Sequence, residues 1–215
     1  MRLSFLKPKE KYIKPLVVKT ANGDSLAEIV DNRLSDKNTV HKYLDVYEPL
    51  MRPKKESAQN VLEVGIYTGG SIRLWHDYFL NATIHGLDIY PEHINIQADI
   101  KNKERIKLYT GIDAYNEDFF KRTFLDKGIK CDIILDDGPH YLESMKAFVR
   151  LYSQILTDDG ILIVEDLDEL EWLDILRNEV PDNIKQYVKT FDLRSISIHQ
   201  NSILFIIDKS SLHSN

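Results

Sequence analysis

Polar and apolar positions divide the chain into two parts near residue 58. The upstream part shows no strand pattern. A short helix is predicted within 22–34, with Asp24 or Ser25 as its N-terminal cap. Within 38–51, apolar side chains recur at the spacing of one helical stripe, namely Val40, Tyr43, Leu44, Tyr47 and Leu50. We therefore expect the upstream part to be a helical extension.

From residue 58 onward, short apolar runs alternate with longer amphipathic segments. Runs of strand length occupy 60–65, 83–89, 105–111, 131–137 and 160–166. Segments of helical period occupy 69–80, 116–125, 141–156 and 168–180, and 91–103 is predicted to be helical or irregular. This alternation indicates βαβ units with right-handed crossovers, which place helices on both faces of a mostly parallel sheet.

The last two apolar runs follow a different pattern. Only a short polar segment separates 184–193 from 201–209, which indicates an antiparallel pair. The predicted fold is α/β: a Rossmann-like, doubly wound, mostly parallel seven-stranded sheet that ends in this antiparallel pair. We expect an N-terminal helical extension or lid over 1–57 and a single core domain over 58–215.

Composition narrows the class of protein. Of the 215 residues, 43% are hydrophobic and 29% charged, which is typical of a soluble globular domain with a real core. The formal net charge is −6. This acidic balance argues against a broad electrostatic grip on nucleic acid or on an anionic membrane. The acidic net charge is compatible with a small-molecule partner and with a homo-oligomer.

The N-terminal letters and the cysteine usage bear on location. The stretch "MRLSFLKPKEKYIKP" does not resemble a signal peptide, because its apolar part is short and interrupted by lysines and prolines. No apolar run approaches the roughly 20 residues that span a bilayer. The single cysteine, Cys131, excludes an intramolecular disulfide and is typical of a reducing compartment. We expect a cytoplasmic protein.

The turn after the first core strand is rich in glycine. In "VLEVGIYTGGS", Glu63 lies near the strand end, Gly65 in the turn, and Gly69 and Gly70 at the start of the helix. Glycine allows positive φ and a close approach of the backbone to a ligand. The spacing is Gly-x-x-x-Gly, not the Gly-x-Gly-x-x-Gly of dinucleotide-binding turns. A ligand loop and a tight turn without a ligand both remain open from this pattern.

The second core strand ends in a carboxylate. Asp88 follows Gly65 by 23 positions (88 − 65). At this place in a nucleotide-binding sheet a carboxylate accepts hydrogen bonds from ribose hydroxyls. Asp88 could equally be a solvated strand end or a helix cap. The glycine turn before it favours ribose binding.

Two later strands end in paired acids. Asp136 and Asp137 end "CDIILDD", and Glu165 and Asp166 end "GILIVED". One helix connects the two strands, so we expect them to be neighbours with their acids in one crevice. Converging carboxylates repel one another unless protonated or neutralised by a cation. Oxygen ligands favour a hard ion such as Mg²⁺. The alternative is that two of the acids cap the helices that follow.

These motifs together resemble a known family. Glu-x-Gly-x-x-x-Gly-Gly-Ser, Leu-Asp-Ile, Asp-Asp-Gly-x-His and Glu-Asp resemble the class I S-adenosylmethionine-dependent methyltransferases. They are most similar to the metal-dependent O-methyltransferases that act on macrolide sugars. The resemblance covers roughly Ser35 to the C-terminus and includes the Asp-Lys…His-x-Tyr segment in "SDKNTVHKYLDVY".

The resemblance implies a role for each matching residue. Glu63, Gly65, Gly69 and Ser71 would surround the amino acid end of S-adenosyl-L-methionine. Further cofactor contacts would come from the following aspartates: Asp88 at the ribose, Asp113 near the adenine and Asp136 near the methionine moiety.

The same resemblance implies the catalytic set. Asp137, Glu165 and Asp166 would bind Mg²⁺, and His140 would be the catalytic base. One departure is Pro139, where the family often has a small polar residue.

The sequence therefore predicts an enzyme, an S-adenosylmethionine-dependent, Mg²⁺-dependent O-methyltransferase. Its acceptor would be a hydroxyl of a sugar, nucleotide-sugar, glycoside or other small polyol. The alternative is a nicotinamide-dependent oxidoreductase, which the Gly-x-x-x-Gly turn and the absence of a Tyr-x-x-x-Lys pair disfavour. A non-catalytic nucleotide-binding module would have no need of the acidic strand ends with His140. RNA methylation is disfavoured by the acidic balance.

Overall fold

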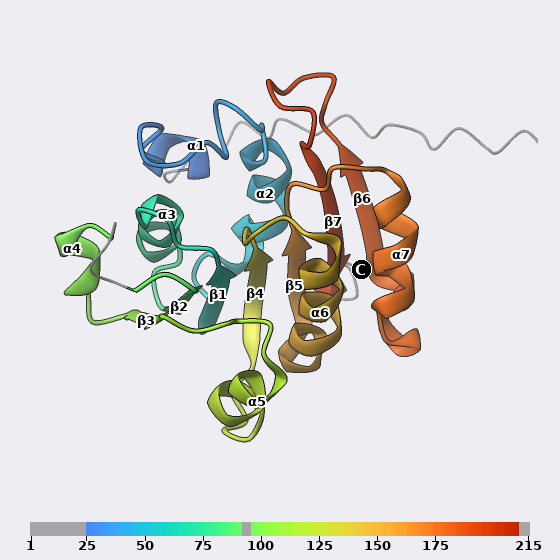
Figure 1. Ribbon diagram of the computed structural model, residues 1–215. Helices are drawn as coiled ribbons and strands as arrows, with labels where there is room; N and C mark the ends of the chain where they lie inside the picture. Colours follow the sequence, from blue (N-terminus) through green and yellow to red (C-terminus); the bar gives the residue numbers. More distant parts are fainter. Residues whose placement is uncertain (1–24, 92–95, 211–215) are drawn as a thin grey trace, which may run out of the picture.

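A computed structural model describes residues 25–91 and 96–210, so the predicted absence of a signal peptide lies outside the described residues. Within that part of the chain, seven strands form one sheet (Figure 1). They are β1 (Asn60–Val64), β2 (Thr83–Asp88), β3 (Ile106–Thr110), β4 (Cys131–Asp136), β5 (Leu156–Val164), β6 (Val188–Asp192) and β7 (Ile203–Asp208). All seven predicted strands are present.

The strand order is β3-β2-β1-β4-β5-β7-β6. The first five strands pair in parallel, and β7 is antiparallel to both β5 and β6. The order reverses between β1 and β4, and ligands of open α/β sheets bind outside the carboxyl ends of the strands at such a point. The predicted doubly wound sheet with its antiparallel C-terminal pair is therefore confirmed.

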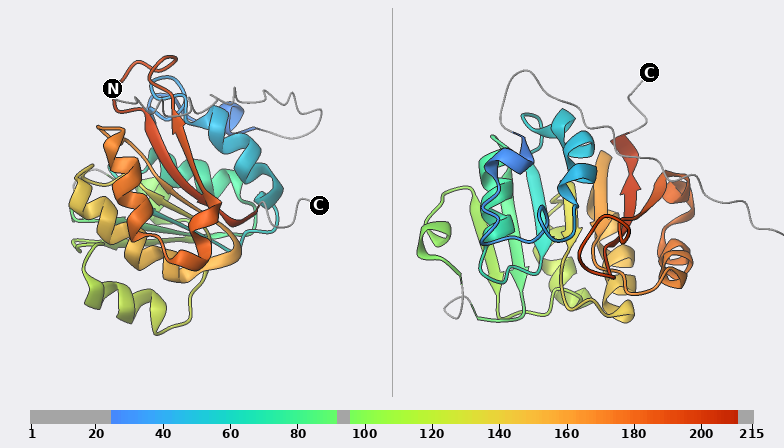
Figure 2. Two further views of the ribbon diagram at one scale, coloured as in Figure 1. Left: turned by 90° about the vertical axis from the view of Figure 1, so that its right-hand side faces the viewer. Right: turned by 90° about the horizontal axis from the view of Figure 1, so that it is seen from above.

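Helices cover both faces of the sheet, as Figure 2 shows. The α-helices are α1 (Leu26–Ile29), α2 (Leu44–Met51), α3 (Gly70–Tyr78), α4 (Ala98–Lys101), α5 (Glu117–Phe120), α6 (Leu142–Tyr152) and α7 (Glu171–Glu179). Shorter helical turns are η1 (Arg52–Lys54), η2 (Lys121–Leu125, a π-helix), η3 (Ser153–Ile155) and η4 (Asp182–Tyr187). One face carries α1 to α4, and the other carries α5, α6 and α7.

Alternate residues of each strand build two separate hydrophobic cores. In β4, Ile133 and Leu135 pack under α1 to α4, whereas Ile134 packs under α5 to α7. Successive side chains of a strand point to opposite faces, so a sheet covered on both sides reads as a continuous apolar run. This explains why the runs ending in acids look fully buried in the sequence.

The upstream helices depart from the predicted bounds. The predicted helix over 38–51 begins only at Leu44, because Lys42 has a positive φ of 64° that interrupts helical geometry. The chain before α2 is instead a series of turns near the carboxyl ends of the parallel strands. The predicted cap of the first helix is confirmed, since Ser25 precedes α1 and forms a capping box with Glu28.

The extension shares its packing with the core. Leu26, Tyr47 and Met51 belong to the same hydrophobic cluster as Val61 of β1. The boundary at 57/58 stays a prediction. Among the described residues, no helix combines the length and apolar character required to cross a bilayer.

Candidate active site

A cavity of about 1050 Å³ opens above the switch point between β1 and β4. Its walls are the loops after β1, β2, β3 and β4, together with residues 32–37, Thr39 and Val40 of the extension. Ligand pockets for small molecules span roughly 300–1000 Å³, so the cavity has room for a nucleoside with an attached amino acid. Of the predicted cofactor residues, those that line it are Gly65, Ser71, Asp88 and Asp113.

Gly65 brings the β1 turn against the β4 loop. It has a φ of +91°, and a Cβ added there would lie 1.9 Å from the carbonyl oxygen of Asp137. The sequence left open whether this glycine turn approaches a ligand, and the structure shows that it closely approaches the backbone of the acidic loop. The glycine therefore determines where Asp137 lies.

Glu63 lies beneath the cavity and is fully buried. Its Oε2 accepts hydrogen bonds from Ser71 Oγ (2.6 Å) and Trp75 Nε1 (3.0 Å). Its Oε1 has no hydrogen-bond partner among the described residues. Burial raises the pKa of Glu63 to about 7. Glu63 thus supports the floor of the cavity, and neither it nor Gly69 lines the cavity.

Asp136 is the other buried acid of the predicted cofactor set. Its Oδ1 accepts a hydrogen bond from the hydroxyl of Tyr115 at 2.6 Å. Burial raises the pKa of Asp136 to about 7. Asp136 is absent from the cavity lining, whereas Tyr115, which donates to it, belongs to that lining. Nothing in the sequence pattern had singled out Tyr115.

Asp88 and Asp113 occupy the far wall of the cavity. Asp88 Oδ2 accepts hydrogen bonds from the backbone N–H groups of Ile66 (2.9 Å) and Tyr67 (3.2 Å). Asp88 therefore also ties down the turn after β1. Asp113 is exposed and accepts a hydrogen bond from the backbone N–H of Tyr115. Their predicted contacts to ribose and adenine stay predictions.

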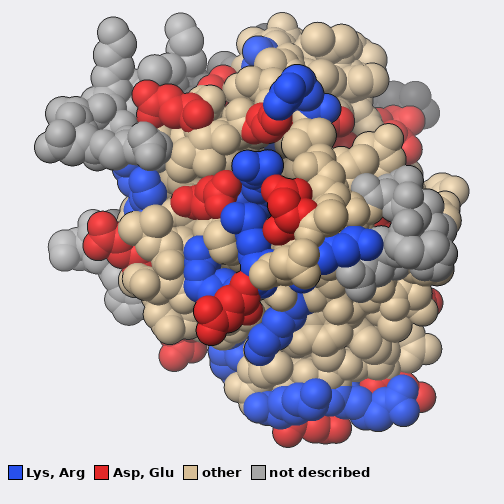
Figure 3. Space-filling model, turned by 90° about the vertical axis from the view of Figure 1, so that its left-hand side faces the viewer, with Lys and Arg blue, Asp and Glu red and all other residues tan. Residues whose placement is uncertain are grey.

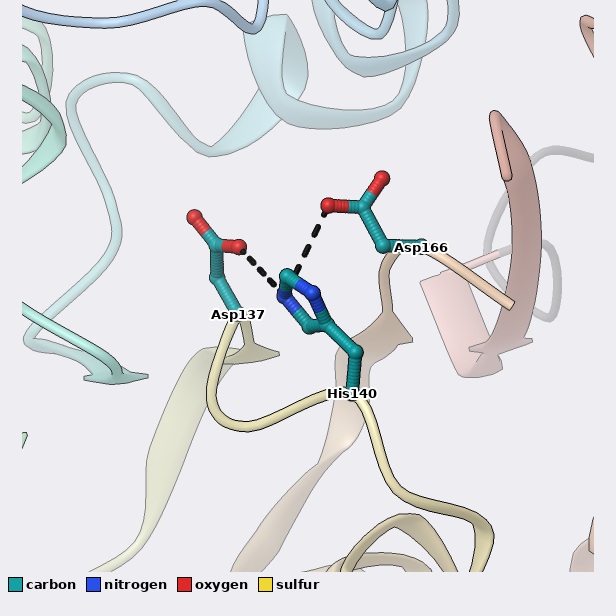
Figure 4. Close-up of side chains that lie close together, drawn as sticks. All are labelled: Asp137, His140 and Asp166. Atoms are coloured by element: carbon teal, nitrogen blue, oxygen red, sulfur yellow. Dashed lines mark hydrogen bonds and ion pairs between the residues drawn. The ribbon is translucent and has the colours of Figure 1, made fainter. Parts of the chain in front are cut away.

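Three side chains converge where the loops after β4 and β5 meet. Figure 4 shows His140 between Asp137 and Asp166. His140 Nε2 lies 3.2 Å from Asp137 Oδ1 and 3.5 Å from Asp166 Oδ2. One ligand atom from each residue falls within 4.8 Å of the others, close to the spacing of atoms around a single ion. Two carboxylates and an imidazole fit a divalent cation.

The backbone is strained at this convergence. His140 and Asp166 both have positive φ values, 57° and 58°. For a residue other than glycine this conformation costs about 1–3 kcal/mol and persists where the surrounding structure imposes it, often at functional sites. Both strained residues turn their side chains toward the same point.

The charge of His140 follows from its neighbours. Burial opposes protonation of the ring, but the carboxylates of Asp137 and Asp166 outweigh burial and raise the pKa of His140 above its usual value. For Asp166, burial raises the pKa, with a further rise from Asp137. The protonation states of Asp137, His140 and Asp166 therefore depend on one another.

Glu165 is held by different partners. Its Oε2 accepts a hydrogen bond from Lys37 Nζ at 2.5 Å, and its Oε1 accepts one from the Tyr47 hydroxyl at 2.7 Å. Lys37 Nζ also donates to Asp137 Oδ2 at 2.6 Å. The structure thus brings Asp137 and Asp166 together with His140, and places Glu165 against Lys37 in the layer behind. A metal-ligating role for Glu165 stays a prediction.

The segment before and within α2 supplies further partners of the acids. The hydroxyl of Tyr43 donates to Asp166 Oδ1, and His41 Nδ1 lies 3.2 Å from the same oxygen. The ring of His41 stacks on that of His199, in the loop between β6 and β7. From the sequence, Tyr43 and Tyr47 belong to the apolar stripe predicted within 38–51. Of the two, Tyr43 is also the tyrosine of the Asp-Lys…His-x-Tyr segment, which is a signal of another role.

The side of the molecule shown in Figure 3 carries no broad basic patch among its described residues. On the side of the molecule shown in Figure 3, Lys and Arg side chains are interspersed with Asp and Glu side chains. Several of the cations are paired, such as Arg73 with Asp99 and Lys121 with Glu117. The predicted lack of a nucleic acid partner stays a prediction.

The strand order, the antiparallel β7 and the cavity at the β1/β4 switch point define the class I methyltransferase fold. A solved structure with this fold is that of MycE, a methyltransferase from the mycinamycin biosynthetic pathway, in complex with Mg and SAH. The TM-score is 0.65 at 19% identity, over 87% of this chain and 55% of that one.

Curated relatives are O-methyltransferases of sugar-bearing compounds. The chain is 30% identical over 146 residues to the 8-demethyl-8-alpha-L-rhamnosyl tetracenomycin-C 2'-O-methyltransferase of Streptomyces olivaceus, covering 64% of this chain and 36% of the relative. It is 27% identical over 142 residues to the mycinamicin VI 2''-O-methyltransferase of Micromonospora griseorubida, covering 62% and 33%.

The similarity to known proteins is partial in two respects. No protein-family model matches the chain. The chain spans only about a third of the length of these curated relatives. The resemblance predicted from the sequence is confirmed in the relatives and in the fold.

Proposed function

We propose that the chain is an S-adenosylmethionine-dependent, Mg²⁺-dependent O-methyltransferase whose acceptor is a hydroxyl of a sugar carried on a small molecule. The observation that supports this most directly is the convergence of Asp137, His140 and Asp166 beside a cavity of nucleoside size. The relatives that methylate glycosylated compounds support the acceptor class.

The methyl donor would lie in the cavity above β1 and β2. Asp88 would accept hydrogen bonds from its ribose, and the turn between Gly65 and Ser71 would surround its amino acid end. S-adenosylmethionine supplies the methyl group as a sulfonium. Because the sulfonium loses its charge in the transition state, carboxylates close to it contribute affinity more than rate. The rate must come from placing the acceptor oxygen near the methyl group.

Asp137 and Asp166 would hold the cation, with Glu165 joining through lone pairs that Lys37 and Tyr47 leave free. A divalent cation supplies Lewis acidity that lowers the pKa of a bound hydroxyl. His140 Nε2 would take the proton from that hydroxyl, since an imidazole has a pKa near working pH. The position of His140 between the two aspartates supports this role.

Calorimetry tests this function. Purified chain is titrated with S-adenosylhomocysteine and with NAD⁺, each with and without Mg²⁺. We expect binding of S-adenosylhomocysteine and no binding of NAD⁺. Tight binding of NAD⁺ alone would favour the oxidoreductase instead. A panel of methyl glycosides, with S-adenosylmethionine consumption as the readout, then tests the acceptor class.

A further inference from the structure

Lys37 occupies an unusual position for a lysine. It is 1% exposed, although lysine is almost never fully buried unless paired. Its ammonium lies 2.6 Å from Asp137 Oδ2, 2.5 Å from Glu165 Oε2 and 3.5 Å from Glu63 Oε1. These three acids come from the ends of β4, β5 and β1. One side chain of the extension therefore joins three strand ends of the sheet.

Asp137 has two oxygens with two different neighbours. Oδ2 faces Lys37, whereas Oδ1 faces His140 in the candidate metal cluster. In carboxylate sites that hold two metal ions, a shared carboxylate lies between ions roughly 3.5–4 Å apart. Here a cation between two carboxylates is already supplied by the chain, since the ammonium of Lys37 contacts both Asp137 and Glu165.

We infer that Lys37 is a positioning residue that acts as a built-in cation: it holds Asp137 and Glu165 in place and limits this site to one divalent ion, held by Asp137 and Asp166 beside His140. The inference rests on the proposed function only in assuming that the cluster binds metal. Lys37 donates directly to Asp137 and Glu165, so its role is exerted through these two carboxylates.

Charge balance supports this assignment. Burial opposes the charge of Lys37, but the carboxylates of Asp137, Glu165 and Glu63 outweigh burial and hold the pKa of the ammonium well above its usual range. Three carboxylates within 3.5 Å of the ammonium favour its charged form. A fixed cation partly neutralises the acids when no metal is bound, so the strand ends can stay together in the empty enzyme.

Metal binding by the full chain tests the inference. Mn²⁺ is titrated into wild type and Lys37→Gln, and free Mn²⁺ is followed by electron paramagnetic resonance. We expect one equivalent in wild type. In Lys37→Gln the uncompensated acids should either bind the first ion at least about tenfold more tightly or take up a second one. Without metal, thermal unfolding should start at a lower temperature in Lys37→Gln than in wild type. Mn²⁺ should reduce this difference in unfolding temperature.

Lys54→Met is the matched control. Lys54 is also buried and pairs with an aspartate, Asp159, at 2.6 Å, but that pair lies away from the acidic cluster. Its removal should leave Mn²⁺ stoichiometry and affinity unchanged. Mn²⁺ binding by Lys37→Gln that matches wild type would overturn the inference while leaving the proposed function intact. Binding of two equivalents of Mn²⁺ by wild type would also overturn the inference and leave the proposed function intact. No Mn²⁺ binding by wild type would overturn both the inference and the proposed function.

A measurement on wild type alone covers the case in which Lys37→Gln does not fold. Acetic anhydride labelling is followed by peptide mass spectrometry, with and without Mg²⁺. Lys37 should stay protected in both conditions, whereas Lys121, whose side chain is 49% exposed, should label rapidly. Labelling of Lys37 that Mg²⁺ accelerates would mean that the metal displaces the ammonium, which contradicts the inference.

Discussion

His140 Nε2 lies 3.2 Å from Asp137 Oδ1, although the two residues are separated by a Gly-Pro turn that exposes its proline. The departure at Pro139 therefore does not move the histidine away from the acid. The left-handed backbone of His140 directs its ring back over the end of β4. This arrangement is what makes His140 a candidate base.

Replacing His140 tests that role. His140→Ala should lower turnover by about 10²–10⁴-fold, the usual contribution of a general base. Binding of S-adenosylhomocysteine should change little, because the ring lies on the metal side of the cavity. Initial rates with the best acceptor of the glycoside panel and calorimetry provide the two readouts. His76→Ala, on α3, is the control and should keep wild-type turnover. Unchanged turnover in His140→Ala would rule out the proposed base.

The Asp88 carboxylate should matter for the methyl donor. Asp88→Ala should weaken S-adenosylhomocysteine binding by about tenfold or more, equivalent to about 1.4 kcal/mol. The variant loses the ribose acceptor and also releases the backbone N–H groups of Ile66 and Tyr67. Asp99→Ala removes an exposed partner of Arg73 outside the cavity lining and should bind normally. Equal affinities for both variants would remove Asp88 from the cofactor site.

Gly65 should tolerate no side chain. In Gly65→Ala the new Cβ would meet the Asp137 carbonyl at 1.9 Å, so the β1 and β4 loops must separate. We expect the free energy of unfolding to fall by about 3 kcal/mol or more. Gly128 has a similar positive φ of 64° but open space around it, so Gly128→Ala should cost only about 1–2 kcal/mol. Urea unfolding compares the two, and equal losses would show that backbone strain alone is responsible.

Stability should depend on pH through His85. Its ring is buried in β2 between Tyr109 and Asn60, and burial lowers its pKa to about 4 from 6.5. The unfolded chain binds this proton near pH 6.5 and the folded chain only near pH 4. The stability is therefore fully present above pH 6.5 and is lost as the pH falls toward 4.

The expected loss from this one group between pH 7 and pH 5 is about 2 kcal/mol. Urea unfolding at the two pH values measures it. His85→Gln can keep both hydrogen bonds without a titratable ring, so its loss over the same interval should be smaller by that amount. An identical pH dependence in the variant would mean that His85 titrates normally in the folded protein.

The local pattern of apolar and polar residues was enough to predict the strands and their two buried faces. It also predicted the edge of the sheet at which the acidic residues lie. The run "CDIILDD" predicts a buried strand because alternate residues enter two cores, and Ile133 and Ile134 do pack on opposite faces. The convergence of Asp137 with Asp166 followed from one rule: parallel neighbours end at the same edge of a sheet.

Contacts between distant parts of the chain were decided only by the tertiary structure. Lys37 meets Asp137 and Glu165 across 100 and 128 positions, and no period or spacing relates such residues. The turn at Lys42 that begins α2 late also had no signal in the apolar stripe of 38–51. Periodicity shows on which face of its own helix or strand a residue lies. Which residues pack against that face depends on how the elements pack together. This packing places Lys37 among the acids.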